Sequence, residues 1–225
     1  MPPFLKAIAA AALLAVPVAL AGEVPGALVT LEVATPLPPG YVPSALPARF
    51  VLLEEGHVFV GGTSQMSAGR LDKAEVQALE QRLLLVRKLP GLSSAVAFGE
   101  AATPRFRLRA TRSKLDVVVT GDPAAGPPAL RPLAALLRDL SAFHHSSLRP
   151  YEPASFLLEA REGPLVGGCR PWRLAVPLAD ALAGPRTVDA RAAYDWPTGA
   201  LPAAVCDGDR RFVVTLRPLL PGERP

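Results

Sequence analysis

Residues 49–60, RFVLLEEGHVFV, place two apolar runs on either side of a short Glu-Glu-Gly connection. A brief glycine-containing connection between runs rich in Val and Phe is typical of a β-hairpin. We therefore expect two antiparallel strands here, and the rest of the fold is read outward from them.

The next patterned stretch, residues 71–91, reads LDKAEVQALEQRLLLVRKLPG and predicts a helix. Asp72 can cap the helix, Glu75 stands three residues later as a capping box requires, and Leu71 can pack on Val76. Apolar residues then recur at spacings of three and four, as on one face of a helix: Val76, Leu79, Leu83 and Val86. The Pro-Gly pair at the end of the stretch stops the helix.

A second hairpin is predicted from Arg105 to Thr120, followed by a second helix that ends before Pro150. The apolar stripe of this helix comprises Leu133, Leu136, Leu137, Leu140 and Phe143. Its start is ambiguous, because three prolines do not fit comfortably into one helical turn: Pro127, Pro128 and Pro132. Residues 49–146 thus read as hairpin, helix, hairpin, helix, which predicts an α+β fold with a four-stranded, mainly antiparallel sheet and two helices on one face.

Outside this core, residues 27–33 read as a strand, and the Pro-rich residues 36–47 read as an irregular connection. Residues 147–225 are predicted to hold short strands at 155–160 and 211–216, separated by loop-rich chain. These two strands could pair with each other or extend the first sheet, so the pattern leaves one domain or two open.

The chain begins with the features of an export signal. Lys6 precedes an apolar run at residues 7–20, and the small residues of Ala19-Leu20-Ala21 precede Gly22. The run is too short, and too interrupted by Pro17, for a membrane span of about 20 residues. We therefore expect residues 1–21 to be a signal peptide cleaved after Ala21, residues 22–48 to form an N-terminal segment, and the protein to be extracytoplasmic, in the periplasm or the medium, with no membrane anchor.

Cys169 and Cys206 are the only cysteines. An even number of cysteines in an exported chain predicts a single disulfide. Closing a loop of this length lowers the conformational entropy of the unfolded chain, which stabilises the folded protein by about 3 to 4 kcal/mol. Two ligands are too few for a structural zinc site, and the two thiols are too far apart in sequence for a C-x-x-C redox motif.

Composition limits the function classes. Half of the residues are apolar, which excludes disorder caused by low hydrophobicity, and 26 prolines predict many extended connections. The formal charge of +4 becomes +3 once Lys6 is removed with the leader, a bias too weak to indicate nucleic-acid binding. The excess of arginine over lysine, with many Ala and Pro residues, indicates a high-GC bacterial genome.

The order of elements resembles that of a known family. A hairpin leads into a helix that begins Leu71-Asp72-Lys73-Ala74-Glu75-Val76-Gln77-Ala78-Leu79; a second hairpin with Arg107-Leu108 leads into Pro128-Ala129-Leu130-Arg131-Pro132-Leu133. Over residues 49–145 this resembles the emfourin-like domain of small bacterial proteins, some of which inhibit thermolysin-type metalloproteases. The resemblance implies a binding protein, and no inhibitory residue is carried over, because its motifs are core and helix positions.

No residue pattern predicts catalysis, a cofactor or a metal site. His144 and His145 are adjacent on a helix, so their side chains point about 100° apart, and near a helix C-terminus they are expected to cap carbonyls or face water. His57 lies beside Glu55 in the first hairpin. Other residues that could suggest phosphate or calcium sites lack the required spacing: Gly61-Gly62, Gly167-Gly168, Gly199, Asp180, Asp189, Asp195, Asp207 and Asp209.

One surface pattern is notable. Arg105, Arg107 and Arg109 alternate with Phe106 and Leu108, so three guanidinium groups are expected on one face of a strand while the apolar pair enters the core. The adjoining turn adds Arg112 and Lys114. Such a strip could engage an acidic protein or anionic polymer, or form an ordinary solvated sheet face.

The function expected from these patterns is that of an exported, non-catalytic protein-binding domain, with inhibition of a protease as one form. Two alternatives come from other classes. One is a cell-envelope hydrolase with His57 or His144 as base, and the other is a protein that binds acidic envelope polymers through the arginine strip. Trp172 and Trp196 are expected to pack beside the disulfide.

Overall fold

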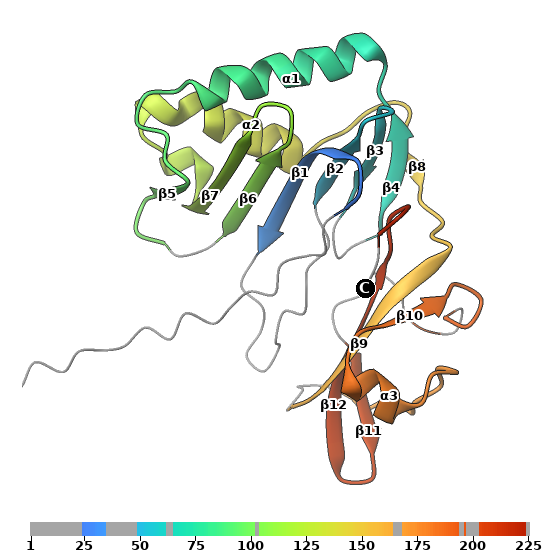
Figure 1. Ribbon diagram of the computed structural model, residues 1–225. Coiled ribbons are helices and arrows are strands. Elements are labelled where there is room, and N and C mark those ends of the chain that lie inside the picture. The colour runs from blue at the N-terminus through green and yellow to red at the C-terminus, as the bar shows by residue number, and fades with distance from the viewer. Residues whose placement is uncertain are drawn as a thin grey trace, which may run out of the picture.

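The computed structural model describes residues 24–34, 49–61, 65–101, 104–163, 168–193, 196 and 203–223. These residues form a mixed α+β protein with two open sheets, one of eight strands and one of four. Figure 1 shows the larger sheet beneath the long helices and the smaller sheet below it. The predicted α+β class is confirmed at this level.

The first sheet has the strand order β5-β7-β6-β1-β2-β3-β4-β8. Every neighbouring pair is antiparallel except β5 and β7, which are parallel. In chain order the strands are β1 (Ala27–Ala34), β2 (Phe50–Leu53), β3 (His57–Val60), β4 (Ser67–Arg70), β5 (Ala95–Phe98), β6 (Arg105–Ala110), β7 (Leu115–Gly121) and β8 (Arg149–Pro150).

Both predicted hairpins are present, as β2–β3 and β6–β7. The predicted count of four strands is wrong, because β1, β4, β5 and β8 also join the sheet. β1 is central and pairs with both β2 and β6. Strand β4 and the edge strand β8 were missed for a physical reason: β4 reads Ser-Ala-Gly-Arg and β8 has two residues, so neither carries an apolar alternation that a sequence pattern could reveal.

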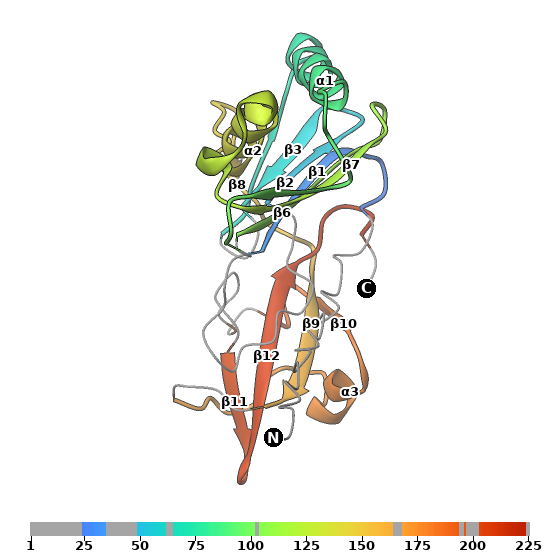
Figure 2. The ribbon, with the colours of Figure 1, turned by 90° about the vertical axis from the view of Figure 1, so that its left-hand side faces the viewer.

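Two helices cover one face of this sheet, as the turned view in Figure 2 makes plain. Helix α1 (Lys73–Arg87) has the predicted capping box: the Asp72 carboxylate accepts from the Glu75 amide, and the Glu75 carboxylate accepts from the Asp72 amide. Helix α2 (Arg131–Ser141) follows two short 3₁₀ turns, Pro123–Ala125 and Pro128–Leu130. Pro127 and Pro128 therefore belong to the second 3₁₀ turn, which Pro127 caps, and Pro132 lies in the first turn of α2.

The core between sheet and helices is fully buried. Leu31, Leu52 and Leu108 from the strands meet Leu83 of α1 and Leu137 of α2 there. Because β1 and β6 carry polar or charged residues on their other face, their alternation fixes which face the helices cover, whereas β2 is apolar on both faces.

The second sheet has the order β10-β9-β12-β11 and is antiparallel throughout. Its strands are β9 (Ser155–Glu162), β10 (Arg186–Asp189), β11 (Ala203–Asp207) and β12 (Arg210–Pro218), and α3 (Leu178–Ala183) packs on β9. The two predicted C-terminal strands therefore pair with each other in a sheet of their own. The described part of this region also contains β10, β11 and α3, which the sequence pattern did not predict, and the disulfide is confirmed between Cys169 and Cys206.

The residues after β12 return to the first sheet and join its helix-free face. Leu220 packs with Val51, Phe59 and Met66 in a small apolar cluster, and the Tyr151 hydroxyl donates to the Leu219 carbonyl at 2.9 Å. This cluster connects the two sheets.

The predicted signal peptide and Pro-rich connection lie outside the described residues, as do Gly62, Gly167, Asp195 and Gly199. Among the helices that the structure describes, none has the length and apolarity needed to cross a membrane.

Candidate functional site

The histidines were the natural candidates for acid-base chemistry, and the structure separates them. The His57 Nε2 atom lies 3.8 Å from a Glu55 carboxylate oxygen in the exposed β2–β3 turn. His144 is exposed, whereas His145 is partly buried, stacks on Phe143 and lies within hydrogen-bonding distance of two other side chains.

His145 lies between Ser147 and Glu75 in an arrangement that resembles a catalytic triad. Its Nδ1 atom is 2.7 Å from the Ser147 hydroxyl, and its Nε2 atom is 3.0 Å from a Glu75 carboxylate oxygen. The Ser147 backbone amide also donates to Nδ1, at 3.2 Å. Because an amide can only donate, Nδ1 accepts, so the proton of the neutral ring is on Nε2 and is donated to Glu75.

The surroundings of Ser147 assign this group a structural role. The Ser147 hydroxyl oxygen accepts from the Arg70 amide at 3.0 Å, and its single proton is shared between the Arg70 carbonyl, at 3.0 Å, and the His145 Nδ1 atom, at 2.7 Å. A Cβ placed on Gly69 would stand only 2.6 Å from that hydroxyl oxygen, so the backbone of β4 closes over it. A nucleophile needs a free approach and a nearby oxyanion site, and the hydroxyl here is held against a strand. The three side chains tie the start of α1 to the chain after α2.

The arginine strip on β6 emerges on the helix-free face, as expected, while Phe106 and Leu108 enter the core. On that face, neighbouring carboxylates neutralise most of the positive charge of the arginine strip. Arg107 makes two hydrogen bonds to the Asp116 carboxylate of β7, at 3.2 and 3.0 Å. Arg109 donates to Glu32 of β1 at 2.7 Å.

These pairs shift the carboxylate pKa values in opposite directions. Burial raises the pKa of Glu32 above its usual value, although Arg109 and Arg107 oppose the shift. Hydrogen bonding from Arg107 lowers the pKa of the Asp116 carboxyl. The strip is therefore a cross-strand ladder of alternating charges, in which only exposed Arg105 lacks a described carboxylate partner, and it offers little net attraction to an anionic polymer.

Arg112 and Lys114 do not continue the strip. They lie in the β6–β7 turn, which contacts α1 on the helix-covered side of the sheet. Arg112 forms an ion pair with Glu80 of α1 at 2.8 Å, and Arg87 of α1 donates to the Lys114 carbonyl at 3.3 Å. These contacts bring the turn alongside α1.

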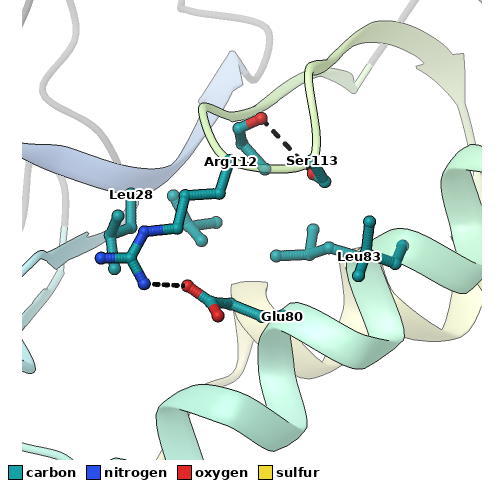
Figure 3. Close-up of a pocket in the computed structure, with 8 residues that line it drawn as sticks. Leu28, Glu80, Leu83, Arg112 and Ser113 are labelled. Atoms are coloured by element: carbon teal, nitrogen blue, oxygen red, sulfur yellow. Dashed lines mark hydrogen bonds and ion pairs between the residues drawn. The ribbon is translucent and has the colours of Figure 1, made fainter.

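A small cavity of about 60 Å³ opens between this turn, β1 and α1 (Figure 3). Leu28 and Leu83 lie on opposite sides of it, with Ser113 on the turn and Glu80 on the helix. The described lining is mostly apolar and comprises Leu28, Val29, Glu80, Leu83, Leu84, Ala110, Arg112 and Ser113. An apolar cavity of ~150 Å³ admits benzene, so this one is too small for an ordinary enzyme substrate.

The helix face beside the cavity is unusual for a surface. Leu84 and Leu85 are 38% and 65% exposed, and they are the large hydrophobic side chains that stand out as exposed among the described residues. Four exposed positions that precede them on the helix carry no charge, Ala74, Gln77, Ala78 and Gln81, whereas exposed Lys73 and Arg82 are charged and Arg82 pairs with Asp139 of α2. A solvated helix face ordinarily carries charged residues, so this surface resembles one that meets another molecule. We call Leu84, Leu85 and the adjacent cavity the α1 patch.

The charges around the α1 patch have a definite sign. Arg87, Lys88, Arg112 and Lys114 contribute four positive charges against one negative charge from Glu80, a net +3. The capping carboxylates, Asp72 and Glu75, lie at the other end of the helix. The C-terminal half of α1 therefore presents an apolar surface bordered by cations.

The remaining candidate groups of the described residues do not form a metal or catalytic site. Among the described residues, no group of three or more His, Cys, Asp or Glu side chains could hold a metal ion. The disulfide holds Arg170 beside β11, where the Arg170 amide donates to the Ala204 carbonyl at 2.9 Å. Trp172 and Trp196 pack edge to face, with ring centroids 5.9 Å apart, in the core of the second sheet.

Comparison of this chain with known protein families, curated proteins and solved structures finds no match. The α1 patch was missed at the sequence level. A signal was present, because three consecutive leucines, Leu83, Leu84 and Leu85, exceed what one apolar stripe of a helix needs.

Proposed function

We propose that this protein is an exported, non-catalytic binding protein that recognises another protein through the α1 patch. The observation that carries the proposal is the pair of exposed leucines, Leu84 and Leu85, which follow uncharged exposed positions on α1 and are bordered by cations. Exposed apolar surface beside a hollow is the usual mark of a protein-binding site.

Export is part of the proposal. The leader pattern of residues 1–21 predicts cleavage after Ala21, and the disulfide between Cys169 and Cys206 is compatible with an oxidising compartment. A protease is one partner class to test, since the order of elements resembles that of the emfourin-like domain.

The hydrolase alternative has weaker support. Ser147, whose hydroxyl contacts His145, is held by both backbone groups of Arg70, and the described lining of the cavity beside α1 contains no histidine. The polymer alternative is weakened because Arg107 and Arg109 already have carboxylate partners.

The test is site-specific photocrosslinking in the cell that makes the protein. A photoreactive phenylalanine analogue replaces Leu85, and the same analogue replaces Arg138, an exposed residue of α2, as the matched control. We expect a discrete protein adduct from position 85 that is absent at position 138, on a molecule whose N-terminus is Gly22. Equal labelling at both positions, or none at position 85, would refute the α1 patch as the binding site.

A further inference from the structure

The cavity and the charges around it indicate the chemistry of the partner, given the proposed function on which this step rests. We propose that the α1 patch binds an acidic protein segment that inserts one aliphatic side chain into the cavity beside Leu84. The segment places carboxylates on both sides of that side chain, next to the cations of the helix end and the β6–β7 turn.

The cavity selects an aliphatic group. Five of its eight described lining residues are Leu, Val or Ala, and the polar ones are already engaged: Glu80 pairs with Arg112, and the Ser113 hydroxyl donates to the Ala110 carbonyl. With ~150 Å³ needed for benzene, 60 Å³ suits a branch of two or three carbons, such as the end of a valine or leucine side chain. An inserted side chain of this kind is how interface anchors generally act.

The surrounding charge selects an acidic segment. Lys88 lies one helical turn beyond Leu84, and Lys114 follows directly after Ser113, so the helix and the turn that border the cavity each carry a lysine. Carboxylates flanking the aliphatic anchor would meet these cations, which favours encounter and fixes the direction of the bound segment.

Two other occupants fit less well. A second copy of this chain, related by a two-fold axis through the patch, would place like positive charges against each other. An anionic polymer or lipid headgroup would satisfy the cations and leave the apolar cavity without a matching group.

The experiment begins with a displayed library of random 12-residue peptides selected on the exported chain with its disulfide intact. We expect selected peptides to contain one Val, Leu or Ile with Asp or Glu on both sides. Synthetic fluorescent copies of these peptides are then measured by anisotropy against four variants of the protein.

Ala110→Val, which fills the cavity from β6, should weaken binding about tenfold or more, and Leu84→Gln at the exposed rim provides a second variant if Ala110→Val unfolds. The pair Lys88→Glu with Lys114→Asp should weaken binding by a similar factor, mainly through slower association. Aspartate suits position 114 because Lys114 has a positive φ of 51°. Arg105→Glu, a charge reversal at the far end of β6, is the matched control and should leave binding unchanged.

Failure to enrich any peptide, enrichment of peptides lacking either the aliphatic or the acidic residues, or binding indifferent to these variants would overturn the inference. The proposed function is judged separately by the photocrosslink at position 85. If that adduct persists in both Ala110→Val and the double charge reversal, the α1 patch remains a binding surface and the acidic-aliphatic partner is excluded.

Discussion

Glu223→Gln tests how the chain after β12 is held in place. Glu223 is 2% exposed and Arg217 is 10% exposed at their side chains, and they meet at 2.6 Å. The second Glu223 oxygen accepts from the Leu220 amide at 3.0 Å, so one carboxylate both neutralises a buried guanidinium and fixes a turn. Glutamine retains a single acceptor oxygen and no charge.

The expected cost follows from that geometry. Removing one partner of a buried ion pair costs about 3 to 5 kcal/mol, because the remaining charge stays buried without compensation. Glutamine can still accept one hydrogen bond, so we expect about 3 kcal/mol, a large part of the stability of a typical domain. Replacing both partners, Arg217→Met with Glu223→Leu, should cost less than the single change, since no uncompensated charge remains.

Urea unfolding at pH 7 measures both effects. Trp172 and Trp196 lie in the core of the second sheet, so their fluorescence follows that half of the molecule, while far-UV circular dichroism follows both. A loss below about 1 kcal/mol for Glu223→Gln, or a double variant at least as unstable as the single one, would refute the buried-pair reasoning.

Three further perturbations test other contacts. Cys169→Ser with Cys206→Ser opens a loop of sequence separation 37 and should cost about 4 kcal/mol in the loop-entropy model, measured by urea unfolding of the second sheet. Ser147→Ala removes the side chain that bonds both backbone groups of Arg70 and should cost about 1 kcal/mol, visible as faster amide exchange at Arg70, whereas unchanged exchange would contradict it. Because the pKa of Glu32 is raised from 4.5, the folded state binds its proton more tightly than the unfolded chain does, and stability falls as pH rises through the folded value. The free energy of unfolding of Glu32→Gln, measured from pH 4 to 7, should lack that decline. Identical pH profiles for this variant and the unmodified protein would contradict the contribution of Glu32.

Local patterns predicted the elements that are encoded within a few residues. The capping box at Asp72 and Glu75 and the strand alternation at Phe106 and Leu108 each depend on close neighbours in sequence, and the structure confirms them. The same holds for the disulfide, because two cysteines allow one pairing.

What could not be predicted depends on distant parts of the chain. The parallel edge strand β5, the central place of β1 and the separate second sheet are decided by pairing between segments far apart in sequence. The link from His145 to Glu75 spans 70 positions, so adjacency of His144 and His145 gave no hint of it. The cavity beside α1 required the β6–β7 turn to be placed against the helix, which a sequence pattern does not specify.

The apolar cluster on the helix-free face joins Phe59 to Leu220, about 160 positions later. During synthesis or translocation these residues emerge far apart in time. The hydrophobic face of β2 and β3 therefore stays exposed to solvent until nearly the whole described chain has emerged. Such high contact order slows folding and gives a holdase chaperone a defined segment to bind in the interval.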